Sequence, residues 1–161
     1  MEKPFISKKD YYDKFLNKKK ETIFNTFYGK ETVEVYSAFK EIENDIEDSN
    51  YLLEYFDEIV EMLSNDKSYI KIRGFRIICK LAKWDVENKI DKVIDLMLNI
   101  LDDSKPTIVR MSLEALSNLI IYKKKLSPKI KSKVSKIDYL KFKDSMSPLI
   151  KKDIDRLLQL L

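Results

Sequence analysis

The chain has 161 residues, a net charge of +4 and 44% hydrophobic residues, which is enough apolar content for one folded domain with a continuous core. It contains only 2 glycines and 4 prolines, whereas tightly turned sheets and phosphate-binding loops need glycine. One cysteine, Cys79, and no histidine exclude an intrachain disulfide, histidine catalysis and a site built from several thiolates or imidazoles.

These limits predict one all-α domain over residues 1–161, with no catalytic residues, no metal and no cofactor. No apolar run approaches the roughly 20 residues of a membrane-spanning helix, and residues 1–9 lack the apolar core of a signal peptide. We therefore expect a cytoplasmic protein that does not enter a membrane. Cys79 occupies an apolar position and is expected to be a buried hydrophobe.

The first 30 residues are expected to form N-terminal capping helices. Apolar residues recur at near-helical spacing over 8–28, with Ser7 as a plausible N-cap, but three consecutive lysines, 18–20, interrupt the stripe. This pattern predicts one broken helix or two short ones. Gly29 follows at a position where a left-handed glycine often ends a helix.

Residues 31–121 are expected to form helical hairpins. The apolar spacing predicts helices at 32–44 and 52–63, then at 69–83 and 86–101, with Ser68 and Asp85 as N-caps of the second pair. A third hairpin begins at Pro106, where a helix has no internal use for the first N–H, and its first helix continues to about residue 121.

Residues 122–161 are expected to hold a lysine-rich segment and a C-terminal capping helix. Ser127-Pro128 starts a short helix, and Ser147-Pro148 starts the last one. This last helix carries apolar residues at helical spacing, so we expect it to cover the end of the stack.

The stretch 66–82 returns 37 residues later as 103–119, so that Arg73 falls on Arg110. A fixed period of this size is typical of stacked helical hairpins, because each hairpin needs neighbours to bury its apolar stripes. The segment 103–110, with proline followed by Val109-Arg110 and then Ala115 and Leu116, resembles a HEAT repeat. Residues 69–83 resemble it less closely, and 32–44 only faintly.

This resemblance implies a right-handed α-solenoid of about three HEAT-like hairpins with irregular N- and C-terminal capping helices. In HEAT proteins the first helices form the convex face, and the second helices form the concave face that often binds a partner. The chain is also similar to small uncharacterised bacterial HEAT-repeat proteins, some of which carry an iron-sulfur-assembly name. One cysteine and no histidine cannot form such a cluster site within the chain.

The function that we expect from this architecture is a non-catalytic scaffold for an unidentified protein partner, with its ligand surface on the second helices. Its oligomeric state stays open. The candidate binding residues combine the repeat arginines, the only tryptophan with its neighbouring aspartate, and the lysine-rich segment: Arg73, Arg76, Trp84, Asp85, Arg110, Lys123, Lys124, Lys125, Lys131, Tyr139 and Lys143.

Each group of candidates also has a structural interpretation. Arg73 and Arg110 fit a polar ladder between repeats, in which arginine bonds a carboxylate or helix-end carbonyls. Asp85 fits a helix cap beside a packed Trp84. The alternative for this pair is a nucleobase pocket, as in the alkylpurine DNA glycosylases that share HEAT-like architecture, although no second tryptophan is present.

Charge is strongly segregated along the chain. Residues 31–66 contain 12 acidic residues and one lysine, whereas residues 123–143 contain nine lysines and only Asp138 as an acid. Both runs are most simply solvated helix faces, but the acidic run could receive a basic partner. The lysines, with Tyr139 among them, could hold a nucleic-acid backbone. Nucleic-acid binding by residues 122–143 is therefore the alternative function.

Overall fold

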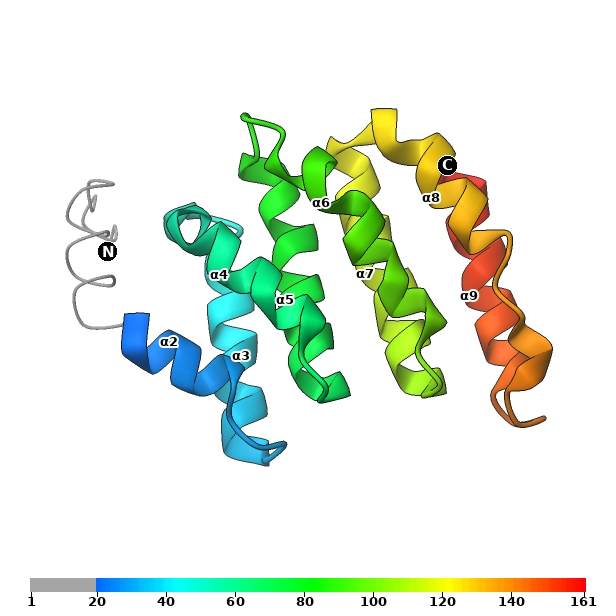
Figure 1. Cartoon of the computed structure of the whole chain (residues 1–161), viewed down its shortest axis with the longest axis horizontal. Coiled ribbons are helices and arrows are strands. Elements are labelled where there is room, and N and C mark those ends of the chain that lie inside the picture. Colours follow the sequence, from blue (N-terminus) through cyan, green and yellow to red (C-terminus); the bar gives the residue numbers. More distant parts are fainter. Residues whose placement is uncertain (1–19) are drawn as a thin grey trace, which may run out of the picture.

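The computed structural model describes residues 20–161, and all regular structure in this part of the chain is helical (Figure 1). The all-α prediction is therefore confirmed. The α-helices are α2 (Lys20–Phe27), α3 (Val33–Asp45), α4 (Phe56–Glu61), α5 (Ser68–Leu81), α6 (Lys89–Leu98), α7 (Pro106–Tyr122), α8 (Ser127–Val134) and α9 (Ser147–Leu160). Among the described helices, none has the length and apolar character needed to cross a membrane. The part of the expected first helix that precedes Lys20 lies outside the described residues.

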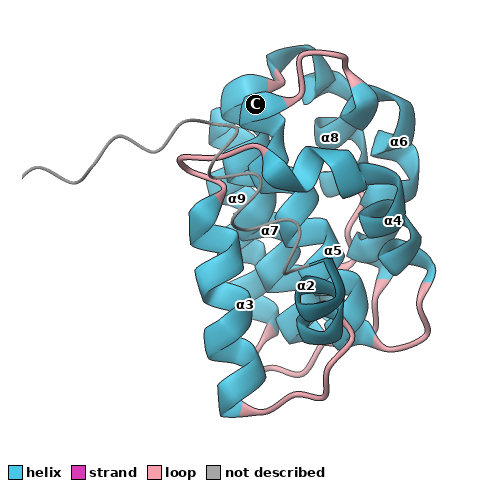
Figure 2. Cartoon of the chain, turned by 90° about the vertical axis from the view of Figure 1, so that its left-hand side faces the viewer, coloured by secondary structure: helices cyan, strands magenta, loops and turns pink. Residues whose placement is uncertain are grey.

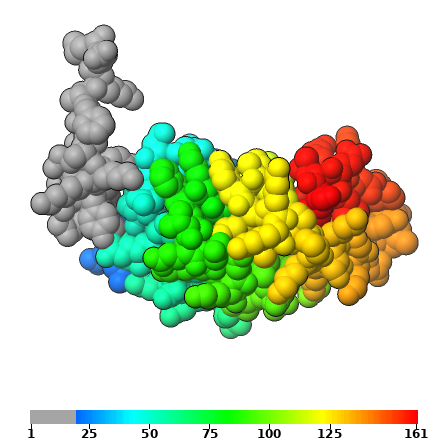
Figure 3. All heavy atoms as spheres, turned by 90° about the horizontal axis from the view of Figure 1, so that it is seen from above, coloured from blue at the N-terminus to red at the C-terminus, as the bar shows by residue number. Residues whose placement is uncertain are grey.

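The helices form two layers. α3, α5, α7 and α9 stand side by side in one layer, where each contacts the next. The shorter helices α4, α6 and α8 form the other layer, which the view along the row separates clearly from the first (Figure 2). Seen from above, α9 in red lies along one edge and the orange residues that include α8 lie along the other (Figure 3). We call these the long-helix layer and the short-helix layer.

The hairpins are phased differently from the sequence-based prediction. The helices at 69–83 and 86–101 were expected to form one hairpin, but the extensive contacts of the short-helix layer join α4 and the turn Met62–Ser64 to α5, and the 3-10 turn Asn99–Asp102 to α7. α8 makes only a slight contact with α9. The apolar pattern located the helices correctly but contained no information on which neighbour each helix contacts most.

The spacing of the long helices explains why the sequence repeat is visible only once. The first residues of α3, α5, α7 and α9 lie 35, 38 and 41 residues apart, so no single period covers the chain. α5 and α7 begin with the same turn, in which Asn65 Oδ1 accepts from Lys67 N at 2.9 Å and Asp103 Oδ1 from Lys105 N at 2.8 Å. The structural register is thus 38 rather than 37. In this register Arg73 and Arg110 are not equivalent positions.

Three expected helix ends differ in the structure. Ser68 is not an N-cap: Lys67 holds that position, and the Ser68 hydroxyl donates to Asp103 Oδ2 at 3.2 Å. The helix expected from residue 86 begins at Lys89, because the chain first makes a turn in which Asn88 has φ 58°. Gly29 does not adopt a positive φ. It is needed instead for space, since a Cβ there would lie 3.0 Å from Asn25 O.

One hydrophobic cluster runs through the described residues between the two layers. Its largest fully buried side chains include Phe39, Phe56 and Phe75, each 2% exposed or less, so neighbouring helices remove one another's apolar stripes from water. Cys79 belongs to this cluster, and burial raises the pKa of its thiol well above the ordinary value. It packs as the buried hydrophobe expected from the sequence.

A close contact between the layers occurs at Gly74 in the middle of α5. A Cβ at this position would lie 2.8 Å from Met62 Cβ and 3.2 Å from Ile59 O. The approach of Met62 and Ile59 to α5 therefore requires a residue without a side chain at position 74.

We predict that Gly74→Ala destabilises the protein. In an open helix interior this change stabilises by about 0.8–1.0 kcal/mol through helix propensity, but here the added methyl group must displace Met62, and overpacking costs about 1–3 kcal/mol. Urea unfolding followed by circular dichroism measures the sign directly. A rise in the unfolding midpoint would contradict the packing described around Gly74.

Candidate binding surface

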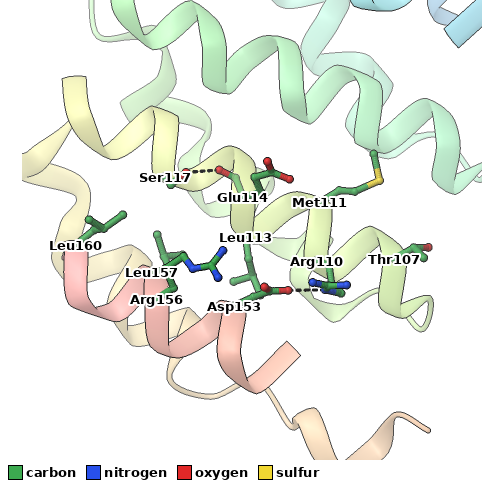
Figure 4. Close-up of a pocket in the computed structure, with 10 residues that line it drawn as sticks. All are labelled: Thr107, Arg110, Met111, Leu113, Glu114, Ser117, Asp153, Arg156, Leu157 and Leu160. Carbon is green, nitrogen blue, oxygen red and sulfur yellow. Dashed lines mark hydrogen bonds and ion pairs between the residues drawn. The ribbon is translucent and has the colours of Figure 1, made fainter. Parts of the chain in front are cut away.

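A groove of about 570 Å³ runs between α7 and α9 on the long-helix layer (Figure 4). Leu113 and Leu157 form its buried floor, each 2% exposed, while Met111 is partly buried and Leu160 is 56% exposed. The α7 residues that line it extend from Thr107 to Ser117, which is about 15 Å along a helix axis. The groove is thus apolar at its base and about three helical turns long.

Four charged side chains line this groove, two of each sign. Arg110 Nε donates to Asp153 Oδ2 at 2.6 Å, and this pair links α7 to α9. Glu114 and Arg156 are both exposed and form no salt bridge with other described residues. Figure 4 shows Arg156 extending from α9 toward α7, with Glu114 projecting from α7. The groove therefore presents one unpaired charge of each sign.

A second hollow, of about 390 Å³, crosses α3, α5 and α7. Its charged centre is Glu43, which is only 4% exposed. Both Glu43 oxygens accept from Arg76, at 2.8 Å each, and Lys40 Nζ lies 2.9 Å from Oε1. The Arg76 guanidinium also stacks over the Phe39 ring at 5.0 Å. This acid was expected to lie on a solvated face, but it is the buried tie between α3 and α5.

The surroundings of Glu43 shift its titration. Burial alone would raise the pKa of this carboxyl, but the hydrogen bonds and charges of Arg76 and Lys40 outweigh burial and hold its pKa below the ordinary 4.5. The ionised form therefore stabilises the folded state above the ordinary pKa of a glutamate.

Arg73 has a structural role at the N-terminal end of the described residues. It is 7% exposed, and its Nη1 atom donates to Phe27 O at 2.9 Å and Gly29 O at 2.6 Å. These carbonyls end α2 and have no partner within the helix. Arg73 thus bonds helix-end carbonyls and Arg110 bonds a carboxylate, both as expected, but they act at opposite ends of the row and not as equivalent rungs of one ladder.

Trp84 and Asp85 hold the corner between α5 and α6. Trp84 Nε1 donates to Ile46 O at 2.6 Å, which ties this corner to the end of α3. Asp85 is 5% exposed, and its oxygens accept from Lys89 N at 2.8 Å and Ile90 N at 2.9 Å. The expected capping role of Asp85 is therefore confirmed, although Asn88 is the formal N-cap.

Lys123 closes the same corner from the end of α7. This lysine is 4% exposed, and its Nζ atom lies 3.1 Å from Asp85 Oδ2, 3.2 Å from Asp91 Oδ1 and 2.9 Å from Asn88 Oδ1. Lys125 reaches the other Asp91 oxygen at 2.9 Å. Burial tends to raise the pKa of Asp91, but Lys125 and Lys123 together lower it. Lys123 is thus a structural residue rather than an exposed binding residue.

The lysine-rich segment is partly neutralised by aspartates of the preceding hairpin. Lys129 pairs with Asp95 at 3.2 Å and Lys133 pairs with Asp102 at 2.7 Å, in addition to the pairs of Lys123 and Lys125. Within residues 20–161 no salt bridge is formed by five exposed lysines of the segment: Lys124, Lys131, Lys136, Lys141 and Lys143. Tyr139 is partly buried and packs against the core.

The predicted site residues do not form one surface. Arg73 lies near α2, Arg76 in the α3–α5–α7 hollow, Arg110 in the α7–α9 groove, and Trp84, Asp85 and Lys123–Lys125 at the corner, whereas Lys131, Tyr139 and Lys143 lie on or after α8. Both hollows described above open on the long-helix layer, opposite to the second helices on which we expected the ligand surface.

Sequence reasoning missed the residues that shape the α7–α9 groove. Leu157 and Leu160 were expected only to cap the stack, and Met111, Glu114 and Arg156 were not singled out. The one available signal is that α9 has apolar residues on more than one side: Leu149 and Leu160 are 39% and 56% exposed. Comparisons with protein-family models, with curated proteins and with solved structures find no match for this chain.

We predict that Lys123→Met destabilises the protein by about 3–5 kcal/mol, because it removes the only cation paired with the buried carboxylate of Asp85 and one of the two cations paired with the partly buried Asp91. Lys124→Met is the matched control, since its neighbouring side chain is exposed and should change stability by less than about 0.5 kcal/mol. Guanidinium unfolding compares the two variants. Equal losses would show that Lys123 is not a structural charge.

We also predict that Glu43→Gln reduces the acid sensitivity of the protein. Because the pKa of Glu43 is lowered in the folded state, its contribution to stability is present above the ordinary pKa and is lost as pH falls through the lowered pKa. The stability difference between wild type and Glu43→Gln should therefore be largest near pH 7 and shrink below about pH 4. Urea melts over this pH range measure it, and Glu41→Gln, an exposed neighbour, should leave the acid limb unchanged.

Proposed function

We propose that this chain is a short right-handed α-solenoid of HEAT-like hairpins, and that it acts as a non-catalytic, cytoplasmic scaffold that binds a protein. The two-layer order of long and short helices supports this architecture. The hairpins of the proposed solenoid are α4 with α5, α6 with α7 and α8 with α9, and α2 with α3 precedes them. The 103–110 segment, which resembles the start of a HEAT repeat, then leads into the second helix of a hairpin.

The α7–α9 groove is the observation that best supports protein binding. It is lined by apolar side chains and by charges of both signs that sum to zero, which matches the apolar centre and polar rim of protein interfaces. Its position on the long-helix layer replaces the second-helix surface, 52–63, 86–101 and 123–143, as our proposed location for the partner.

Nucleic-acid binding by the lysine-rich segment is the second candidate, and the five lysines without a salt bridge support it. Pairing of Lys123, Lys125, Lys129 and Lys133 with aspartates lowers the net positive field of this surface, so we rank it below protein binding.

The scaffold proposal predicts capture of a partner through the groove. We expect tagged wild-type protein, cross-linked in extracts of its host, to recover a reproducible set of proteins, and Leu160→Asp to lose them, because a charge placed in an apolar contact is desolvated without a partner. Quantitative mass spectrometry of the captured fractions measures the loss.

Leu140→Asp is the matched control, since Leu140 is 74% exposed and does not line the groove. It should capture the same proteins as wild type, and circular dichroism should show both variants folded. Recovery of no protein by wild type would contradict the scaffold proposal. Recovery of nucleic acid, with binding in gel shifts that weakens steeply as salt rises, would favour the second candidate.

A further inference from the structure

The chemistry of the α7–α9 groove restricts the kind of chain that can occupy it. Two helices that run side by side form its walls, Leu113 and Leu157 form its floor, and Met111 and Leu160 form its apolar edges. The unbranched Met111 side chain can adapt to different apolar partners. The lining thus provides side-chain contacts over about three helical turns.

An extended peptide would gain little in this groove. Extended segments bind by adding a strand to an exposed sheet edge, where their backbone groups find partners. The groove walls are α-helices whose backbone N–H and C=O groups are already used within α7 and α9. A bound strand would bury its own backbone without hydrogen bonds, which is costly. A helical ligand satisfies its backbone internally.

Two other ligand classes also fit the lining poorly. Proline-rich segments need aromatic side chains on which their rings pack, and single-stranded nucleic acids need aromatic rings and an excess of positive charge. No aromatic residue is among the groove-lining residues, and the two arginines are balanced by Glu114 and Asp153. The apolar floor is therefore suited to the nonpolar face of an amphipathic helix.

The unpaired charges add an orientation. Arg110 is already bonded to Asp153, so it is unavailable without breaking that pair. Arg156 extends from α9 toward α7, and Glu114 projects from the exposed side of α7, where it also borders the α3–α5–α7 hollow. A helix that seats its apolar face between them meets a cation at the α9 wall and an anion at the α7 wall. Complementary charges there would select its direction and register.

We propose that the α7–α9 groove binds an amphipathic helix of a protein partner, with apolar residues at i, i+3 or i+4, and i+7, an acidic residue paired with Arg156 and a basic residue facing Glu114. This inference rests on the proposed scaffold function and specifies its partner class. Arg156 is the residue that determines specificity, while Leu157 and Leu160 supply the apolar contact.

The test uses a displayed library of helical peptides, with randomised positions on one face, selected on the folded full-length chain. Enriched sequences are expected to share the apolar spacing and a fixed acidic position, and a synthetic peptide of the consensus should become helical when bound. Arg156→Glu should weaken its binding about tenfold or more, because a charge-assisted hydrogen bond is lost. A peptide with the acid changed to lysine should bind Arg156→Glu about as well as the original binds wild type.

Lys152→Glu makes the same charge change on α9 at an exposed residue that does not line the groove, and it should leave affinity within about twofold at 0.15 M salt, where distant charges are screened. Selection of no helical consensus, or binding that survives Leu160→Asp and Arg156→Glu, would overturn the inference. If capture from host extracts still depends on Leu160, the scaffold proposal stands and only the helical partner fails. If capture also fails, both fail.

Discussion

The rest of the structure depends on the burial of α5 and α7 between neighbours on both sides. α5 contacts α3 and α7 within its layer and the segment that contains α4 behind it, so nearly its whole circumference is apolar or close-packed. Gly74 permits the close approach of Met62, because a side chain at position 74 would collide with it. Buried apolar area of this kind provides most of the stability of a helical stack, and it positions every other element relative to α5 and α7.

Polar contacts then join each step of the row at its edges. Arg73 bonds the end of α2, the Glu43–Arg76 pair joins α3 to α5, and Trp84 bonds the end of α3. Lys123 fills the same role at the end of α7 by contacting Asp85 and Asp91. Buried ion pairs are weak sources of net stability, but each is costly to break. They therefore fix the register of neighbouring helices more than they strengthen the stack.

The lining of the groove differs from the core of the row. α5 with α7 and α7 with α9 both make long contacts, but above Leu113 and Leu157 the link from α7 to α9 is the Arg110–Asp153 ion pair. A charged pair cannot fill space as closely packed aliphatic residues do. Leu160 is exposed, since α9 has no further long helix beside it in the described chain.

The sequence by itself determined that the chain is helical and where most helices lie, because apolar spacing, proline at the first turn and scarce glycine act locally. Pro106 marks the start of α7, and Asp85 caps α6, as those residue types predict. Tertiary structure alone decided which helices pair, the 38-residue register of α5 and α7, and the burial of Glu43 and Lys123. These features depend on contacts between residues more than 30 positions apart, which no local pattern encodes. The groove was hidden for the same reason, since its two walls come from helices that begin 41 residues apart.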